Sequence, residues 1–76
     1  MKDFLEYIAR HLVDHPDAVN IQFEEKEDKV IFKLNVGEDD VGKVIGKKGR
    51  TAQAMRTLLG AVAAKEGKRA ILEIAD

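Results

Sequence analysis

Apolar side chains near the start of the chain recur at helical spacing, which predicts an amphipathic helix. The positions that form this stripe are Phe4, Leu5, Ile8, Leu12 and Val13. Asp3 is the expected N-cap, with Glu6 three residues later completing a variant of the capping box. We expect the helix to end near His15, because Pro16 disfavours helical geometry in the residue before it.

Strict alternation of apolar and polar residues follows, in two runs separated by the polar stretch 25–29. The positions that share one face are Val19, Ile21 and Phe23 in the first run, and Val30, Phe32, Leu34 and Val36 in the second. Period-two runs joined by a short polar loop predict an antiparallel hairpin with one buried face. The alternation returns over residues 69–75, where Ala70, Leu72 and Ile74 share a face and predict a third strand.

Two further helical segments lie between the second and third strands. After Gly37 and three acidic residues, an Asp can cap a short turn over residues 41–45. Thr51 can cap a second long helix that runs to about Lys65, and Gly67 is the expected C-terminal cap.

The predicted order is helix, strand, strand, helix, helix, strand, within a single domain spanning residues 1–76. The second and third strands are separated by enough chain for a crossover, which normally makes its strands parallel. The fold class is therefore α+β, with a three-stranded mixed sheet, the second strand central and the helices packed on one face.

Composition excludes several classes of protein. The chain has no cysteine, so it has neither a disulfide framework nor a cysteine-based metal site. No apolar run approaches the ~20 residues that a membrane span needs. We expect a cytoplasmic protein with no membrane association, no cofactor, no metal and no small-molecule substrate.

The net charge of −1 hides an uneven distribution. Residues 1–42 hold five basic and 11 acidic residues, whereas residues 43–76 hold eight basic and three acidic ones. A run of five cations without an acid comprises Lys43, Lys47, Lys48, Arg50 and Arg56. This local basic patch is suited to a polyanion.

The segment Gly46-Lys47-Lys48-Gly49, called the glycine loop below, joins the two predicted helices. Glycines allow a sharp turn and close approach to a ligand, and unpaired amides at the start of a helix favour an anion. Lys47 and Lys48 can neutralise phosphate. A GKKG sequence alone is more often a solvated turn, but here Val44 and Ile45 precede it and other cations flank it.

At these residues the chain resembles the KH family, whose signature is an apolar-Ile-Gly-x-x-Gly loop between two helices. The element order is similar to the type II arrangement of that family. The run from Ile45 to Thr51, followed by Met55-Arg56-Thr57-Leu58-Leu59, resembles the bacterial KhpA group.

The resemblance implies non-catalytic binding of single-stranded RNA, with the glycine loop holding the backbone of about four nucleotides. The RNA-binding residues it implies, together with their flanking cations, are Lys43, Val44, Ile45, Gly46, Lys47, Lys48, Gly49, Arg50 and Arg56. Bases would lie over an apolar floor for which Val41, Val44 and Ile45 are candidates, although core packing explains the same pattern equally well. The KhpA resemblance further implies an RNA chaperone or post-transcriptional regulator that pairs with a KhpB (Jag-like) protein in cell-shape and peptidoglycan control.

Aromatic residues are few, and the phenylalanines occupy predicted core positions. Since each base stacked on an aromatic ring contributes ~1–3 kcal/mol, we expect weak binding with little sequence selectivity.

The apolar arc of the helix after the glycine loop is wider than one packed face requires. Ala52, Met55, Leu59, Val62 and Ala63 form the main stripe, and Ala54, Leu58 and Ala61 widen it. Either the rest of the domain covers this arc, or an exposed strip of Ala54, Leu58 and Ala61 forms a homodimer interface.

Other classes of function fit the residues less well. The chain has no serine or cysteine nucleophile, and the glycine spacing does not match a P-loop. Asp39 or Asp40 could hold magnesium near a phosphate, but acidic clusters of this kind are far more often solvated turns. A zinc site at His11 and His15 has no evident third ligand. A protein-interaction module and a single-stranded DNA binder remain open alternatives to RNA binding.

Overall fold

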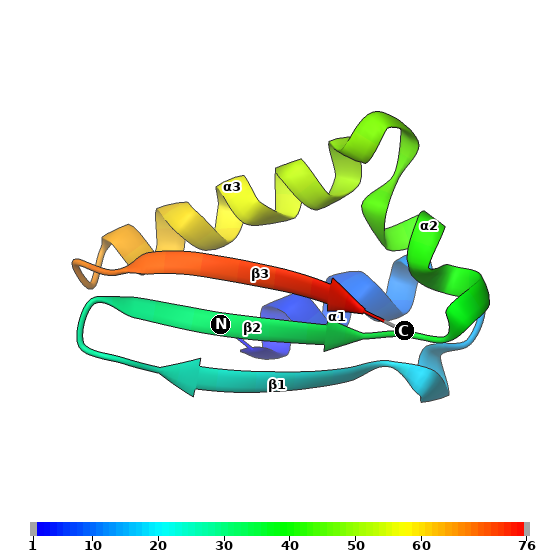
Figure 1. Cartoon of the computed structure of the whole chain (residues 1–76), viewed down its shortest axis with the longest axis horizontal. Helices are drawn as coiled ribbons and strands as arrows, with labels where there is room; N and C mark the ends of the chain where they lie inside the picture. The colour runs from blue at the N-terminus through cyan, green and yellow to red at the C-terminus, as the bar shows by residue number, and fades with distance from the viewer. Residues whose placement is uncertain (1, 76) are drawn as a thin grey trace.

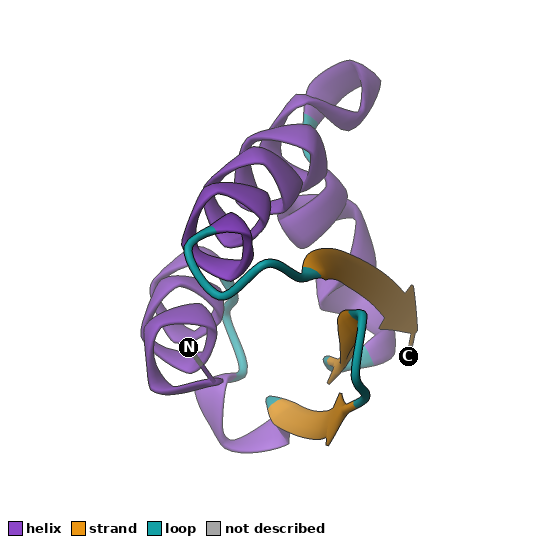
Figure 2. Ribbon diagram, turned by 90° about the vertical axis from the view of Figure 1, so that its left-hand side faces the viewer, coloured by secondary structure: helices purple, strands orange, loops and turns teal. Residues whose placement is uncertain are grey.

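Three helices cover one face of a three-stranded sheet, and the other face of the sheet is open (Figures 1 and 2). The computed structural model describes residues 2–75; the predicted ends of the domain, Met1 and Asp76, lie outside the described residues. The helices are α1 (Lys2–Leu12), α2 (Val41–Ile45) and α3 (Arg50–Ala64), and the strands are β1 (Asn20–Glu25), β2 (Lys29–Asn35) and β3 (Arg69–Ala75). Three 3-10 turns connect them: η1 (Pro16–Ala18), η2 (Glu38–Asp40) and η3 (Lys47–Gly49).

The sheet has the predicted topology, with β2 in the centre. β1 pairs with β2 in antiparallel register, with Phe23 opposite Phe32. β3 pairs with β2 in parallel register, with Leu72 opposite Phe32 on the other side. The order of elements, the mixed sheet and the helices on one face are therefore confirmed.

The core lies between the sheet and the helices. Val30, Phe32 and Leu34 of the central strand are fully buried, because β2 is flanked by a strand on each side and covered by helices. The helical residues buried against them include Leu5 and Ala9 of α1 and Met55, Leu59 and Ala63 of α3.

The prediction that all three phenylalanines lie in the core is wrong for two of them. Phe4 is 44% exposed and Phe23 is 41% exposed, whereas Phe32 is completely buried. Phe23 contacts the Phe32 ring at 5.2 Å between centroids, but β1 is an edge strand and leaves the outer side of Phe23 open to solvent. Val62 of the predicted α3 stripe is also 40% exposed.

The ends of the helices differ from prediction at three places. α1 already includes Lys2, so Asp3 lies in its first turn and is not the N-cap. α1 ends at Leu12, three residues before the predicted end, and the backbone amide of His15 is instead bound by a distant carboxylate described below. α3 begins at Arg50 with Gly49 as N-cap, so Thr51 lies inside the helix.

Gly67 ends α3 as predicted. Its φ of 72° is left-handed; its amide donates to the Ala64 carbonyl, and the Lys68 amide donates to the Ala63 carbonyl. These two bonds form a Schellman motif. Within residues 2–75, no helix combines the length and apolar character needed to cross a membrane.

Candidate nucleic-acid interface

Gly46 occupies a backbone conformation that only glycine adopts readily. Its φ is 80° and its ψ is 172°, and its amide closes α2 by donating to the Gly42 carbonyl at 2.9 Å. A Cβ atom added at Gly46 would lie 2.2 Å from Oγ1 of Thr51. The chain therefore requires glycine here for two reasons, its conformation and its contact with the first turn of α3.

The second half of the glycine loop is a left-handed turn. Lys48 has φ 58° and ψ 25°, and Gly49 follows with φ 73° and ψ 13°. A left-handed lysine is uncommon and carries strain of about 1 kcal/mol, which is typical of backbone held for a functional purpose. The two residues redirect the chain into α3.

The sequence suggested that the amides of this segment are bare, and that is only partly correct. The Gly46 amide is bonded within α2, the Gly49 amide donates to the Gly46 carbonyl at 3.1 Å, and the Arg50 amide donates to the Lys47 carbonyl. The amides of Lys47 and Lys48 make no backbone hydrogen bond within residues 2–75. Of the five amides of residues 46–50, those of Lys47 and Lys48 are thus free to bind an anion.

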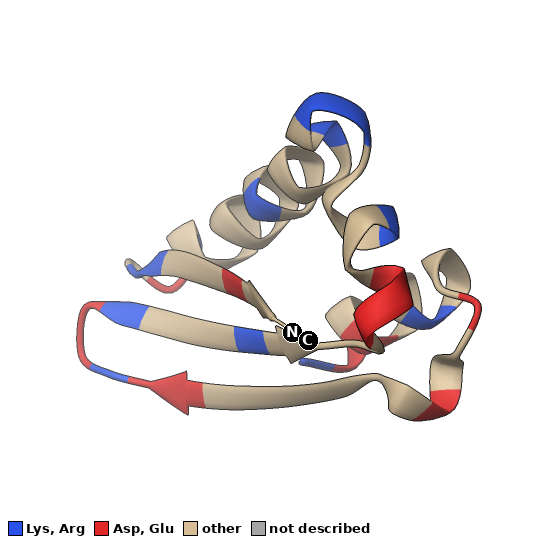
Figure 3. Cartoon of the chain, turned by 45° about the vertical axis from the view of Figure 1, so that its right-hand side comes forward, with Lys and Arg blue, Asp and Glu red and all other residues tan. Residues whose placement is uncertain are grey.

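The glycine loop projects away from the sheet and carries a cluster of positive charge. Lys47, Lys48 and Arg50 are exposed, and within the described residues none of them forms an ion pair. Figure 3 shows this basic turn at the tip of the molecule, separated by α2 from the acidic turn η2. Three unpaired cations around two free amides are an arrangement whose chemistry suits an anion.

Arg56 lies one and a half turns further along α3 and points toward the edge of the sheet. Its Nη2 donates to the Leu72 carbonyl of β3 at 3.4 Å. β3 is an edge strand, so Arg56 bridges α3 and the free edge next to it. This placement leaves its other donors available to a ligand between the two elements.

Lys43 differs from the other cations of the basic run. Its Nζ forms an ion pair with Asp14, and lies 3.6 Å from Oδ1 of Asp40. The hydrogen bond that Lys43 donates to Asp14 raises the pKa of Lys43, and the charges of both carboxylates add to this. The run that Lys43 begins contains no acid in the sequence, but in the fold Asp14 and Asp40 lie beside the Lys43 side chain.

The predicted apolar floor divides between core and surface. Val44 is completely buried and packs in the core, so its side chain is not part of an exposed groove. Val41 is half-buried against the core, and Ile45 is 38% exposed beside the glycine loop. Ile45 is thus the floor candidate whose side chain a ligand can reach.

The proposed interface strip on α3 is open to solvent. Ala54, Leu58 and Ala61 are all exposed, and Leu58 retains 48% of its accessible surface. With Val62 they form an apolar strip on the side of α3 away from the core. Of the two interpretations of the wide apolar arc, incomplete coverage by the domain is the one that the structure supports.

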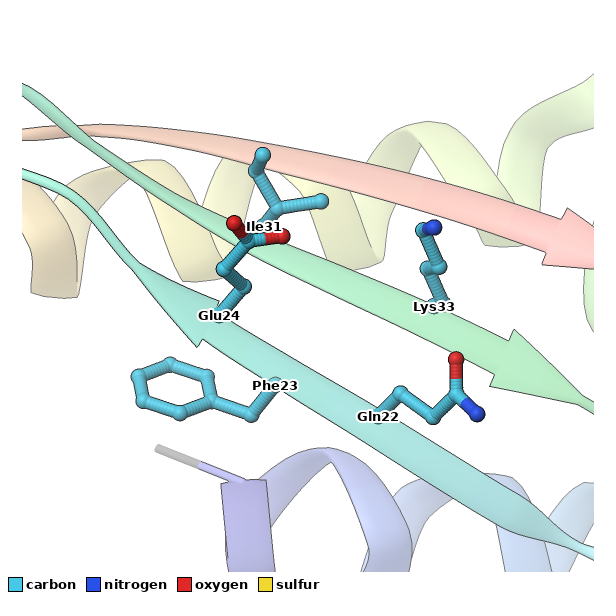
Figure 4. Close-up of a pocket in the computed structure, with 5 residues that line it drawn as sticks. All are labelled: Gln22, Phe23, Glu24, Ile31 and Lys33. Atoms are coloured by element: carbon cyan, nitrogen blue, oxygen red, sulfur yellow. The ribbon is translucent and has the colours of Figure 1, made fainter.

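The open face of the sheet carries a shallow hollow of about 290 Å³. Its lining residues, drawn in Figure 4, are Gln22, Phe23, Glu24, Ile31 and Lys33. A second hollow lies along α1 and is lined by Asp3, Glu6, Tyr7, Arg10 and His11. Neither hollow borders the glycine loop.

Sequence reasoning missed the central role of Asp40. The sequence predicted that an Asp, not specified further, caps α2; Asp40 does stand at the N-cap position, but its side chain makes no capping hydrogen bond. Its two oxygens instead accept the backbone amides of Asp14 and His15 at 3.2 and 3.0 Å. Nothing in the local sequence distinguishes Asp40 from its acidic neighbours, because its hydrogen-bond partners Asp14 and His15 lie more than 20 residues away.

The element order, the mixed sheet and the glycine loop between α2 and α3 define a KH domain of the type II arrangement. The family model described as KhpA/KhpB, KH domain matches residues 2–74. The chain belongs to this KhpA/KhpB family of KH domains.

Relatives of similar length support the same grouping. The chain is 50% identical to a protein of Clostridium acetobutylicum named RNA-binding protein KhpA, over 97% of this chain and 99% of that one. Proteins of the same name from Borreliella burgdorferi and Chlamydia caviae are 49% and 46% identical, over 97% and 100% of this chain and 90% and 97% of theirs. No solved structure matches the chain significantly.

Proposed function

We propose that this protein binds single-stranded RNA without catalysis, through the glycine loop and the surface between α2, α3 and the edge of β3. The observation that carries the proposal is the loop itself, in which exposed Lys47 and Lys48 surround two unbonded amides. Amides and ammonium groups both donate hydrogen bonds to phosphate oxygens, and such contacts carry no sequence information. An exposed Ile45 and a tethered Arg56 supply contacts for bases on the flanks of the loop.

Binding by this surface rests mainly on phosphate contacts. The exposed aromatic side chains Phe4, Tyr7 and Phe23 lie on α1 and β1, outside the loop, so they offer no stacking platform beside it. If about three phosphates are engaged, log K falls with log salt at a slope near −2 for a single strand. Little base selectivity is expected from a single domain.

The relatives' names support RNA over DNA and over a purely protein-binding role. From the family resemblance we extend the proposal to an RNA chaperone or post-transcriptional regulator. The same resemblance suggests a KhpB-like partner and a role in cell-shape and peptidoglycan control.

The test reverses the charge of the loop. Lys47→Asp combined with Lys48→Asp is expected to weaken single-stranded RNA binding at least tenfold, because two phosphate contacts become repulsive. Fluorescence anisotropy with single-stranded RNA, single-stranded DNA and duplex RNA measures both the loss and the preference. Circular dichroism checks that the variant folds.

A matched control reverses two cations elsewhere. Lys26 and Lys65 are exposed and lie at the opposite end of the molecule, in the β1–β2 hairpin and after α3 (Figure 1). Lys26→Asp with Lys65→Asp makes the same change in net charge and is expected to leave most of the affinity intact. Equal losses in the two double variants would show that binding depends on net charge and not on the loop.

We also propose that the exposed strip of α3 joins two copies of this chain. Ala54 and Ala61 are small enough for two helices to approach closely, and Leu58 and Val62 supply apolar area between them. A dimer carries two loops and gains avidity without new contacts to RNA. Ala61→Asp is expected to sediment as a monomer, whereas Gln53→Asp, on the other flank of α3, keeps the dimer. An unchanged mass for Ala61→Asp would exclude this strip as the interface.

A further inference from the structure

Asp40 is fully buried and is the one charged side chain among residues 2–75 that is. Its Oδ1 accepts the amide of Asp14 at 3.2 Å, and its Oδ2 accepts the amide of His15 at 3.0 Å. A buried carboxylate bonded to two amides is a satisfied group, and its loss leaves both amides without a partner. Asp40 therefore ties the chain between α1 and η1 to the start of α2.

The hydrogen bonds to Asp40 affect the glycine loop through α2. Asp40 immediately precedes α2, and α2 is a helix of only five residues that ends where the loop begins. A helix this short has little stability of its own and depends on its tertiary contacts. Its contacts with the rest of the domain include Val44 in the core, half-buried Val41, and the network around Asp40.

Lys43 closes the same network from the other side. It lies on α2 and its ammonium group contacts Asp14 and Asp40, which belong to two different segments. Its ion pairs direct it toward the α1–η1 connection, whereas Lys47 and Lys48 have no ion pair within the described residues. The raised pKa of Lys43 and the lowered pKa of Asp40 agree with this arrangement.

Building on the proposed function, we propose that Asp40 and Lys43 are positioning residues that hold the glycine loop in its phosphate-binding geometry, and that Lys43 does not itself contact RNA. The network of Asp14, His15, Asp40 and Lys43 is called the corner latch below. We take the latch to keep most molecules in the phosphate-binding geometry. A variant in which only about a tenth of the molecules have this geometry then binds RNA about tenfold more weakly. The contacts between loop and RNA stay the same in number.

The first test needs no RNA. In Asp40→Asn, one amide loses its acceptor and the ion pair with Lys43 is removed, so α2 opens more often. Hydrogen exchange at the internally bonded amides of Gly46, Gly49 and Arg50 is expected to become about tenfold faster relative to amides of β2. Unchanged relative exchange at these amides would overturn the latch.

The second test separates positioning from contact. Asp40→Asn is expected to bind single-stranded RNA about tenfold more weakly with an unchanged salt slope. Lys43→Gln is expected to lose about threefold, also with an unchanged slope, because it weakens the latch without removing a phosphate contact. A slope shallower by about 0.7 in Lys43→Gln would show that Lys43 binds phosphate directly and would overturn its assigned role.

Two controls distinguish a specific effect from a general loss of stability. Glu25→Gln removes the ion pair with Lys68, which joins the end of β1 to the connection between α3 and β3 at the other end of the molecule (Figure 1). Ile21→Val reduces core packing and lowers the melting temperature without touching the latch. Neither control is expected to change exchange at Gly46 relative to β2. If Asp40→Asn does not fold, Lys43→Gln and Asp14→Asn decide the question by the same exchange measurement.

The failure of this inference is distinguishable from the failure of the proposed function. If reversing Lys47 and Lys48 abolishes RNA binding while latch variants change neither exchange nor affinity, the loop binds RNA and the latch is wrong. If latch variants accelerate exchange in the loop while the charge reversal leaves RNA binding intact, the latch holds its loop but the loop is not the RNA site.

Discussion

Gly46 and Gly49 occupy left-handed backbone at the two ends of the glycine loop, but they face different surroundings. A Cβ at Gly46 would meet Oγ1 and Cβ of Thr51 at 2.2 and 2.7 Å, whereas a Cβ at Gly49 would meet nothing within 4 Å. Conformation and contact thus both constrain Gly46, and conformation alone constrains Gly49.

We expect Gly46→Ala to destabilise the protein by about 3 kcal/mol, from backbone strain and the clash with Thr51 together. Gly49→Ala is expected to cost about 1 kcal/mol, from the left-handed conformation alone. Urea unfolding followed by circular dichroism measures both values. Equal losses would mean that the contact between Gly46 and Thr51 relaxes without cost.

Lys48 combines a left-handed backbone with a charge, and a single substitution separates the two. Asn tolerates left-handed φ better than Lys, so Lys48→Asn is expected to change the free energy of unfolding by less than about 0.5 kcal/mol. Its RNA affinity is expected to fall, with a salt slope smaller in magnitude by about 0.7 for the lost phosphate contact. Anisotropy titrations at several salt concentrations give the slope; full affinity in Lys48→Asn would remove its ammonium group from the site.

At the scale of elements, the sequence pattern predicted those helices, strands and turns whose form depends on local chain geometry. Alternation located the buried residues of β2, because a central strand covered on one face requires period two. A glycine past the last apolar position of α3 predicted its C-terminus, since a left-handed cap favours glycine. The glycine loop was predictable for the same reason, because its left-handed backbone conformations require glycine at particular positions of the local sequence.

Features that depend on contacts between distant segments were not predictable in this way. Asp3 and Thr51 have the residue type of a cap, but both lie inside the first turn of their helices. Phe4 and Phe23 fit the apolar pattern and are still half exposed. Periodicity predicts on which face a side chain lies, but not how completely neighbouring residues cover it. The pairing of Lys43 with Asp14 spans 29 residues and leaves no local signal.

The C-terminal end of α3 offers a test of stability that does not involve the interface. Gly67→Ala places a Cβ on left-handed backbone in the Schellman motif and is expected to cost about 1 kcal/mol. Gly67 lies at the opposite end of α3 from the glycine loop (Figure 1), so RNA affinity measured well below the melting temperature is expected to be unchanged. A parallel loss of affinity would mean that the loop depends on global stability.

On the scale of the whole molecule, the fold separates the basic glycine loop from the acidic turn η2, and the two are connected through the network around Asp40. The basic loop projects at the tip, the acidic turn η2 lies below α2, and the corner latch connects them (Figure 3). Folding thereby uses one of the five cations of the basic run as a structural partner for acids. The acidic first half of the chain therefore contributes to the placement of the basic loop instead of merely balancing its charge.

The latch gives the stability of the protein a defined dependence on pH. Burial by itself raises the pKa of Asp40, but the amides of Asp14 and His15, with the nearby charges of His15 and Lys43, hold it below the usual value of 3.8. The unfolded carboxyl therefore takes up its proton at a higher pH than the folded one. The resulting stability is complete above pH ~4 and is lost as the pH falls through the folded pKa. The raised pKa of Lys43 acts at the opposite extreme: its contribution is complete below 10.5 and is lost as the pH rises through the folded value.

We therefore expect the wild-type protein to lose more stability between about pH 5 and pH 3 than Asp40→Asn does, because the variant has no carboxylate to protonate at the latch. Urea unfolding at several pH values in this range measures the difference. Asp17→Asn is the matched control, since Asp17 is exposed in η1 and has neither an ion pair nor a side-chain hydrogen bond within residues 2–75. The control is expected to keep the wild-type acid sensitivity. Parallel curves for the wild type and Asp40→Asn would place the acid-sensitive group elsewhere and would remove the energetic basis of the latch.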